Sequence, residues 1–244
     1  MKFGWIIKIA IVLALVLAGT FLINLQKANY EKVIVKFLDK HEMDFIAESD
    51  IVALINDGKD SVVQENANLR LIEQKIKNFQ FIKDCQVSRD LQGNLIVEIT
   101  QNRPLGRLSF SQEAQKGGYI SEEGKILPLS DRFTARVVLI TGQGASKIDE
   151  NYLKNDGKAF FEFLQFIDQD IFWQAQISQI KLDKAGKISF YTQIGEQEII
   201  LGTAQDFKTK LDKLYTFYQS ISTVKGWKKY QTINLQYDKQ IVCR

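Results

Sequence analysis

The longest hydrophobic segment of the chain lies at its beginning. Residues 3–25, FGWIIKIAIVLALVLAGTFLINL, are almost entirely apolar, and Lys8 is the single charged side chain among them. At a rise of ~1.5 Å per residue, a helix of this length reaches ~35 Å, which is enough to cross a hydrocarbon layer of ~30 Å. The pattern therefore predicts a membrane anchor, with residues 1–27 forming a short tail and this helix.

A cleaved signal peptide is the alternative for this segment. Lys2 and Lys8 could form its basic part, and Ala18–Thr20 offers small residues for cleavage. The apolar core of a signal peptide is about 7–15 residues long, whereas here the hydrophobic run continues through Phe21–Leu25. A retained anchor is therefore favoured. Lysines on both sides leave the orientation undecided by charge, and the short tail favours a cytoplasmic N-terminus.

Beyond the anchor, the pattern up to about residue 102 has the order strand, helix, helix, strand, strand. Glu31–Leu38 is rich in β-branched and aromatic residues, and Ser49 is a candidate N-cap for a short helix. Asn68–Phe79 has apolar residues at helical spacing and predicts an amphipathic helix. Alternating residues on both sides of the turn Gln92–Asn94 predict a hairpin. We expect a three-stranded sheet covered on one side by two helices.

The remaining chain, residues 105–244, combines short strands with two longer helices. The helices are predicted near residues 156–167 and 207–221, and in the first of them Phe163 and Ile167 lie on the apolar side. The predicted fold class is α+β, with a mixed β domain in this part. Its strands are predicted at Leu105–Phe110, within the hairpin Gly118–Pro128, and at Val137–Ile140, Ile177–Leu182, Ile188–Thr192, Glu198–Leu201, Thr232–Tyr237 and Lys239–Cys243.

The charge distribution argues against nucleic-acid binding. Residues 1–27 contain three lysines and no acidic residue, which accounts for the whole formal charge of +3. The remaining chain holds 29 basic and 29 acidic side chains. No cluster of Lys and Arg, with or without interleaved aromatic residues, marks a nucleic-acid surface.

The residues that usually carry catalysis or bind metals are sparse. His41 is the single histidine and falls in a predicted polar turn, so a catalytic triad has no evident base. Gly142–Gly144 resembles part of a phosphate-binding loop but lacks the remaining signature. Cys85 and Cys243 show no metal-ligand spacing; a disulfide is permitted outside the cytoplasm, and a buried thiol is the favoured interpretation of Cys85. We therefore expect no enzyme activity, cofactor or metal.

The segment LRLIEQKIKNFQFIKDCQVSRDLQGNLIVEITQNRPLGRL, residues 69–108, resembles a POTRA domain. The resemblance rests on the helix, the Phe81-Ile82 step, the small residue Cys85 before Val87, and the closing Arg103–Leu105. It places a POTRA domain at residues 28–104. A POTRA domain directly after one transmembrane helix is similar to the bacterial cell-division family FtsQ/DivIB.

The C-terminal part extends this resemblance. It contains, in the order of the FtsQ/DivIB β domain, Ser121–Gly124 in a hairpin, Leu201-Gly202, Lys210-Leu211 and Leu235–Tyr237. Residues 105–244 therefore resemble the β domain of that family.

The resemblance implies a non-enzymatic, single-pass protein of the divisome. It implies a cytoplasmic N-terminus, an inner-membrane anchor and periplasmic domains at the division site, where such proteins bind FtsB and FtsL and help to recruit and regulate septal peptidoglycan synthesis. A partner segment would add a strand to an exposed sheet edge. The final strand is the expected edge; Tyr237 matches the recurrent tyrosine of the family, and its neighbours Asp238, Gln240 and Ile241 are further candidates for partner binding.

Two other functions are compatible with parts of the sequence. One is a POTRA-containing component of protein transport or assembly, which would normally carry several POTRA repeats or a large membrane barrel. The other is a secreted enzyme released by signal-peptide cleavage, for which the sequence offers no active site.

Overall fold

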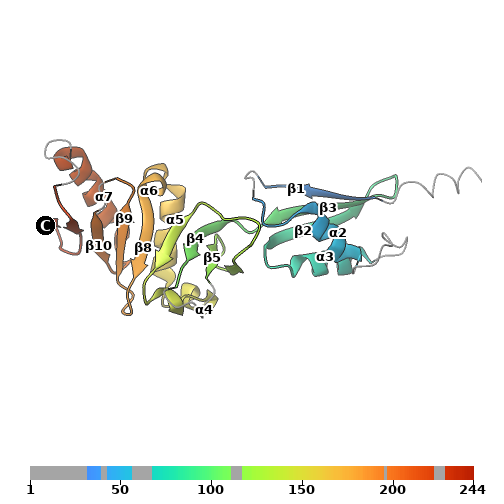
Figure 1. Ribbon diagram of the computed structural model, residues 1–244, viewed down its shortest axis with the longest axis horizontal. Helices are drawn as coiled ribbons and strands as arrows, with labels where there is room; N and C mark the ends of the chain where they lie inside the picture. Colours follow the sequence, from blue (N-terminus) through green and yellow to red (C-terminus); the bar gives the residue numbers. More distant parts are fainter. Residues whose placement is uncertain (1–31, 40–42, 57–67, 111–116, 195–196, 223–228) are drawn as a thin grey trace, which may run out of the picture. The chain divides into compact units, whose positions relative to one another are not determined.

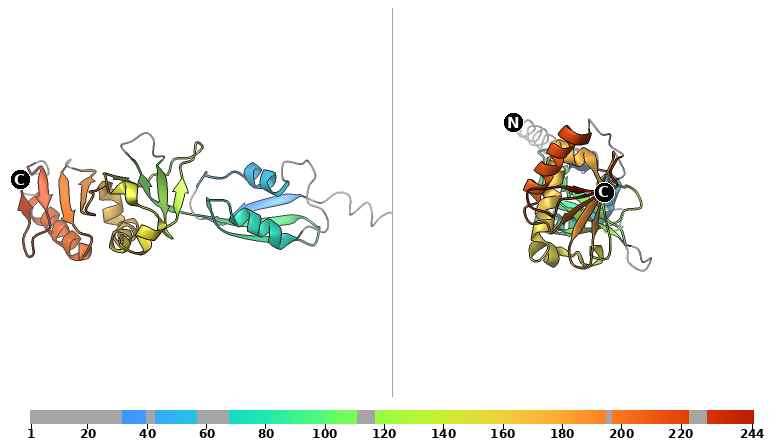
Figure 2. Two further views of the ribbon diagram at one scale, coloured as in Figure 1. Left: turned by 90° about the horizontal axis from the view of Figure 1, so that it is seen from below. Right: turned by 90° about the vertical axis from the view of Figure 1, so that its left-hand side faces the viewer.

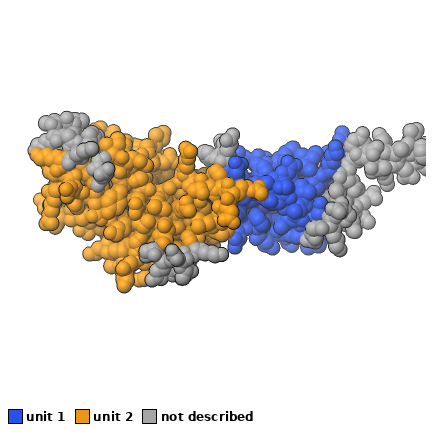
Figure 3. Space-filling view, viewed as in Figure 1, with its two compact units in different colours: residues 1–101 blue, residues 102–244 orange. Residues whose placement is uncertain are grey.

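The computed structural model describes residues 32–39, 43–56, 68–110, 117–194, 197–222 and 229–244. The chain divides into two compact units between Gln101 and Asn102 (Figure 3). The predicted anchor at residues 3–25 and the predicted turn around His41 lie outside the described residues. Within the described ranges, no helix combines the length and the apolar character needed to span a bilayer.

The first unit has the predicted β-α-α-β-β order (Figure 1). Its three-stranded sheet has the order β1-β3-β2, with β1 parallel and β2 antiparallel to the central β3. The buried residues of the strands and helices form one core, in which Ile51, Ile76 and Val97 are almost fully buried. The elements are β1 Val33–Phe37, α2 Glu48–Asn56, α3 Leu69–Lys77, β2 Ile82–Arg89 and β3 Leu95–Gln101.

The two helices of this unit begin in different ways. The Asn68 side chain accepts a hydrogen bond from the Arg70 N–H and caps α3, at the predicted start of that helix. The prediction that Ser49 caps α2 is wrong, because this helix already begins at Glu48. Here the Asp50 carboxylate accepts a hydrogen bond of 2.9 Å from the Ala47 N–H. That contact is the N3-to-N-cap half of a capping box, so the cap lies two residues earlier than expected.

Cys85 lies in β2 and is only 2% exposed. Burial disfavours the thiolate and, with the nearby Glu73 and Asp84 carboxylates, raises the pKa of the Cys85 thiol to about 11, although Lys77 opposes the shift. The thiol is thus a protonated core group at neutral pH, in agreement with the buried thiol favoured by the sequence.

We expect the stability of the first unit to fall as the pH rises from about 9 to about 11. In this window the unfolded chain has already released the Cys85 proton and the folded chain has not, so folding is progressively disfavoured. The thiolate absorbance of Cys243→Ala protein reports the Cys85 titration, and urea unfolding at each pH reports stability. The added substitution Cys85→Ala should remove this component of the pH dependence. Ionisation of the folded thiol near pH 9 would contradict the expectation.

The second unit is built on a nine-stranded mixed sheet of order β12-β11-β10-β9-β8-β7-β4-β5-β6. The pairs β4–β7, β7–β8 and β10–β11 are parallel, and the others are antiparallel. The meander predicted at residues 177–201 is present as β8, β9 and β10. The strands are β4 Pro104–Leu108, β5 Gly118–Ser121, β6 Ile126–Pro128, β7 Val138–Thr141, β8 Ile177–Leu182, β9 Ile188–Thr192, β10 Glu198–Gly202, β11 Thr232–Asn234 and β12 Val242–Cys243.

Helices pack on the core side of this sheet (Figure 2). The two predicted helices are α5 Lys158–Gln169 and α7 Phe207–Phe217, the latter continuing into a π-helical turn at Tyr218–Ser222. Two short helices, α4 Glu150–Lys154 and α6 Ile171–Gln176, were not predicted. Asp149 caps α4 and Asp170 caps α6, each through its carboxylate. The α+β class predicted from the sequence is confirmed for the described residues.

Candidate functional site

The nine-stranded sheet ends at β12, close to the C-terminus of the chain (Figure 1). The Arg244 N–H donates to the Thr232 carbonyl at 3.0 Å, and the Thr232 N–H donates to the Arg244 carbonyl at 3.1 Å. Because hydrogen-bonded and non-hydrogen-bonded positions alternate along an antiparallel pair, the main-chain groups of Cys243 point away from β11. Among the described residues, no strand pairs with this outer side of β12, so it is an open edge that can pair with an added strand.

The edge lies in the part of the chain where the sequence predicted it, but the predicted strands are longer than the observed β11 and β12. Tyr237, Asp238, Gln240 and Ile241 lie in the connection between β11 and β12, not in a strand. Lys239, in the middle of this connection, has a φ of 58°, which is a left-handed conformation incompatible with an extended strand.

The predicted residues differ in exposure. Tyr237 is 49% exposed and lies outside the strands, so the alternative of a half-buried aromatic within a sheet does not apply to it. Asp238 and Gln240 are exposed, and Ile241 is partly buried against the core. All four lie in the connection that leads into β12, and their role in binding stays a prediction.

Side chains of the sheet and of α7 hold this connection in place. The Asn234 carboxamide oxygen accepts a hydrogen bond of 2.9 Å from the Gln236 N–H, which turns the chain immediately after β11. The Lys213 ammonium donates to the Tyr237 carbonyl at 2.8 Å and is 3.4 Å from the Leu235 carbonyl. The connection is therefore fastened to α7 through its backbone, and the Tyr237 side chain stays exposed.

A groove of about 710 Å³ lies between α7 and the C-terminal strand. Its apolar lining comes from Phe217, Tyr230, Ile241 and Cys243. Cys243 pairs with the fully buried Ile233, so its side chain lies on the helix-covered face of the sheet. The polar residues of the lining are Thr209, Asp212, Lys213, Thr216, Ser220, Lys239 and Gln240.

Three of the sequence motifs meet next to this groove. Gly202 has a φ of 79°, and a Cβ atom built on it would come within 2.6 Å of the Gln236 side chain. The glycine of Leu201-Gly202 thus provides the space and the backbone conformation that the Leu235–Tyr237 segment needs. Lys210 donates to the Thr203 carbonyl at 2.8 Å, and burial lowers the pKa of its ammonium group. These motifs thus lie together where the end of β10 meets the segment that follows β11.

Sequence reasoning missed Cys243, Phe217 and Tyr230 as lining residues of the groove. The available signal was the order of elements, in which a strand, a helix and a strand follow each other at residues 198–234. A parallel connection of this type places its helix on one face of the two strands that it joins. The position of α7 over the last strands could therefore have been inferred.

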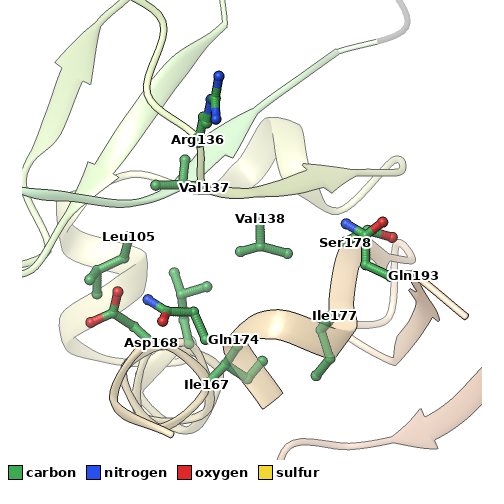
Figure 4. Close-up of a pocket in the computed structure, with 11 residues that line it drawn as sticks. Leu105, Arg136, Val137, Val138, Ile167, Asp168, Gln174, Ile177, Ser178 and Gln193 are labelled. Atoms are coloured by element: carbon green, nitrogen blue, oxygen red, sulfur yellow. The ribbon is translucent and has the colours of Figure 1, made fainter. Parts of the chain in front are cut away.

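A smaller cavity of about 260 Å³ lies between α5, α6 and the first residues of β7 and β8. Figure 4 shows Val137 and Val138 on one side of it and Ile167, Gln174 and Ile177 on the other. The cavity is lined by both apolar and polar side chains, and its polar residues must be considered as possible catalytic groups.

The acid and the hydroxyl of this cavity are both engaged in structural contacts. Asp168 binds the Arg103 guanidinium through two hydrogen bonds of 2.8 and 2.7 Å, and the Arg103 Nε atom lies 3.1 Å from Glu122. The Asp168 carboxylate raises the pKa of Arg103, so the guanidinium stays positively charged in this contact. The Ser178 hydroxyl donates to the Tyr191 carbonyl. No base activates this hydroxyl among the lining residues of the cavity.

The Gly142–Gly144 loop has a structural explanation. The Gly144 N–H donates to the Leu182 carbonyl, and the Ala145 N–H donates to the Gly142 carbonyl. These amide groups are used within the fold and do not converge on a phosphate position. In the part of the chain that the structure describes, no group of three or more His, Cys, Asp and Glu side chains is placed to hold a metal ion.

A comparison with protein families gives a match to the family model described as FtsQ/DivIB, C-terminal related, over residues 103–244. A search of curated proteins finds no significant match. The matched family is related to the C-terminal domain of FtsQ/DivIB, a non-enzymatic domain, and is distinct from FtsQ itself. The match supports the resemblance at the level of an FtsQ/DivIB-related C-terminal domain and indicates a role connected with cell division. The match covers more than half of the chain, which therefore belongs to the FtsQ/DivIB C-terminal-related family.

Proposed function

We propose that this protein is a single-pass, inner-membrane component of the divisome that binds FtsB/FtsL-like partners through the edge strand β12. Its residues 3–25 would form the anchor, with the N-terminus in the cytoplasm and the two units in the periplasm. In this role it would help to recruit and regulate septal peptidoglycan synthesis at the division site. The observation that carries the proposal is the open edge of β12 beside an apolar groove, within a domain related to FtsQ/DivIB.

The geometry of β12 specifies how a partner strand would pair. Cys243 presents its N–H and carbonyl outward. A partner strand would exchange main-chain hydrogen bonds with this residue. The side chains of Cys243 and of the neighbouring Ile241 line the groove together with Phe217 and Tyr230.

Selectivity would come from the groove. Every second side chain of an added strand faces the same side of the sheet, so some partner side chains would point toward α7. An apolar side chain there would cover Ile241 and Tyr230, which line the groove and are both partly exposed. Main-chain pairing thus supplies a general attachment, and the groove supplies the preference for a particular sequence.

The variant Cys243→Pro tests the proposed edge. Proline removes the outward N–H without removing a hydrogen bond of the β11–β12 pair, because the Cys243 N–H does not point to β11. We expect capture of the partners to fall by about tenfold, which corresponds to the loss of roughly one main-chain hydrogen bond. The measurement is co-purification of the full-length protein from membranes, with the captured proteins identified and quantified by mass spectrometry.

The matched control for this test is Cys243→Ala. It removes the same thiol but keeps the N–H, so capture should stay within about threefold of the wild-type level. Circular dichroism and thermal unfolding show whether each variant is folded. A folded Cys243→Pro protein that captures the same partners in the same amounts would refute the assignment of this edge.

A further inference from the structure

The outer edge of the first unit carries an unusual amount of exposed apolar surface. β1 is an edge strand of the sheet β1-β3-β2. Ile34, Phe37 and the following Leu38 are 37%, 38% and 57% exposed. An exposed, apolar edge strand readily pairs with another strand, and stable proteins usually cover or charge such edges.

Hydrogen bonds to β3 define which main-chain groups of β1 are directed outward. The Leu95 N–H donates to the Lys32 carbonyl at 2.9 Å, and the Leu38 N–H donates to the Ile99 carbonyl at 2.8 Å. The parallel register therefore directs the even-numbered residues of β1 to β3. The N–H and carbonyl groups of Val33, Val35 and Phe37 point to the outer side, on which no strand of the described part of the chain pairs with β1.

The charge of this edge favours an uncharged partner strand. Lys36 is the one charged residue within β1, and its ammonium lies 3.8 Å from the Glu98 carboxylate on the neighbouring strand. An acidic segment would gain little attraction, because the charge of Lys36 is already balanced by Glu98. A basic segment would be repelled by Lys36. The complementary strand is thus apolar and nearly neutral, as β1 itself is.

We propose that the partner of this edge is β1 of a second copy of the chain, in antiparallel orientation. The strand is self-complementary about Val35, since Val33 would face Phe37 of the second copy and Val35 would face its own counterpart. All three are outward-directed residues, so each of these pairs can exchange two main-chain hydrogen bonds. The two three-stranded sheets would become one continuous sheet related by a twofold axis.

The same register places the side chains without conflict. Ile34 of each copy lies opposite Lys36 of the other, on the face of the sheet away from the helices. The aliphatic part of Lys36 can cover the exposed Ile34, while its ammonium keeps the contact with Glu98. The two lysines lie diagonally, not directly opposite each other. Val33 and Phe37 meet on the other face, where the exposed Phe37 ring would become covered.

Disulfide trapping tests this interface in the full-length protein. In Cys243→Ala background, Val35→Cys should form a covalent dimer on mild oxidation, because paired Cα atoms of this type lie about 5.5 Å apart. The matched control is Ser88→Cys, an exposed position on β2 at the opposite edge of the same sheet. We expect the Val35→Cys dimer to form about tenfold faster, since the interface raises the effective concentration of the two thiols.

A second variant separates pairing from thiol chemistry. Val35→Pro removes one outward N–H and leaves the hydrogen bonds to β3 in place, so sedimentation velocity should show loss of the dimer. Val35→Thr keeps the N–H and the β-branched shape and should dimerise like the wild type. Equal trapping of Val35→Cys and Ser88→Cys, a folded Val35→Pro protein that still dimerises, or trapping of Val35→Cys to a different protein would each overturn the proposal.

Discussion

Replacement of Phe163 with alanine is expected to lower the unfolding free energy of the second unit by about 4 kcal/mol. Phe163 lies in the middle of α5 and has no exposed surface. Its ring packs edge-on against Phe207 of α7 at a centroid distance of 5.5 Å and lies 6.3 Å from the Phe190 ring of β9. The truncation would leave a cavity where two helices meet the sheet, and these three elements cannot all move to fill it.

Urea unfolding followed by circular dichroism measures this loss. The matched control is Ile171→Ala in the neighbouring α6, because the Ile171 side chain is 87% exposed and its removal should change the free energy by less than about 0.5 kcal/mol. The slope of the free energy with urea concentration should stay the same for both variants. A loss below about 1 kcal/mol for Phe163→Ala would mean that this core is not packed as described.

The helix α5 was predicted well because the spacing of its apolar residues fits a helix and does not fit a strand. Phe160, Phe163 and Ile167 recur at helical spacing, and all are buried. Phe161 and Phe166 widen the apolar arc, and both are packed at its margins: Phe166 lies 5.4 Å from the Phe207 ring, and Phe161 lies beside the Gly124 turn. The aromatic cluster is therefore core packing, as the sequence favoured.

Sheet order could not be predicted in the same way. β7 pairs with both β4 and β8 in parallel, so its neighbours are separated from it by a hairpin on one side and by helices on the other. Local alternation of apolar and polar residues identifies a strand but not its neighbours. The short helices α4 and α6 were missed for a related reason, since each depends on one Asp cap and on packing of Leu153 or Trp173 into the common core.

In the candidate site, too, the features set by neighbouring residues in the sequence were predictable, and those set by contacts between distant residues were not. The position of the last strands near the C-terminus was predictable from the alternating pattern, and the edge is where it was expected. Their length was not, because an Asn234 side-chain hydrogen bond and the left-handed Lys239 end the extended backbone. The groove was missed because it forms between α7 and β12, which come together only in the folded unit.

The second large effect is expected at Gly142, the first glycine of the loop that follows β7. Its φ of 96° lies in the region that favours glycine, and a Cβ atom on it would lie 2.3 Å from the Leu182 carbonyl oxygen. That oxygen is part of the backbone and also accepts the hydrogen bond from the Gly144 N–H, so it cannot move aside without breaking a second contact. We expect Gly142→Ala to lower the unfolding free energy by about 3 kcal/mol, from strain and collision together.

Gly186→Ala is the control that separates these two causes. Gly186 has a φ of 77°, but the nearest atom to a built Cβ is the Tyr152 hydroxyl at 4.0 Å, so its substitution carries backbone strain without a collision. Its cost should be about 1 kcal/mol, and the remaining difference of about 2 kcal/mol belongs to the approach of Gly142 to Leu182. Urea unfolding of the two variants under the same conditions measures this difference. Equal destabilisation would show that the backbone at Leu182 shifts to make room for the added Cβ atom. Gly142 would then be required only for its backbone conformation.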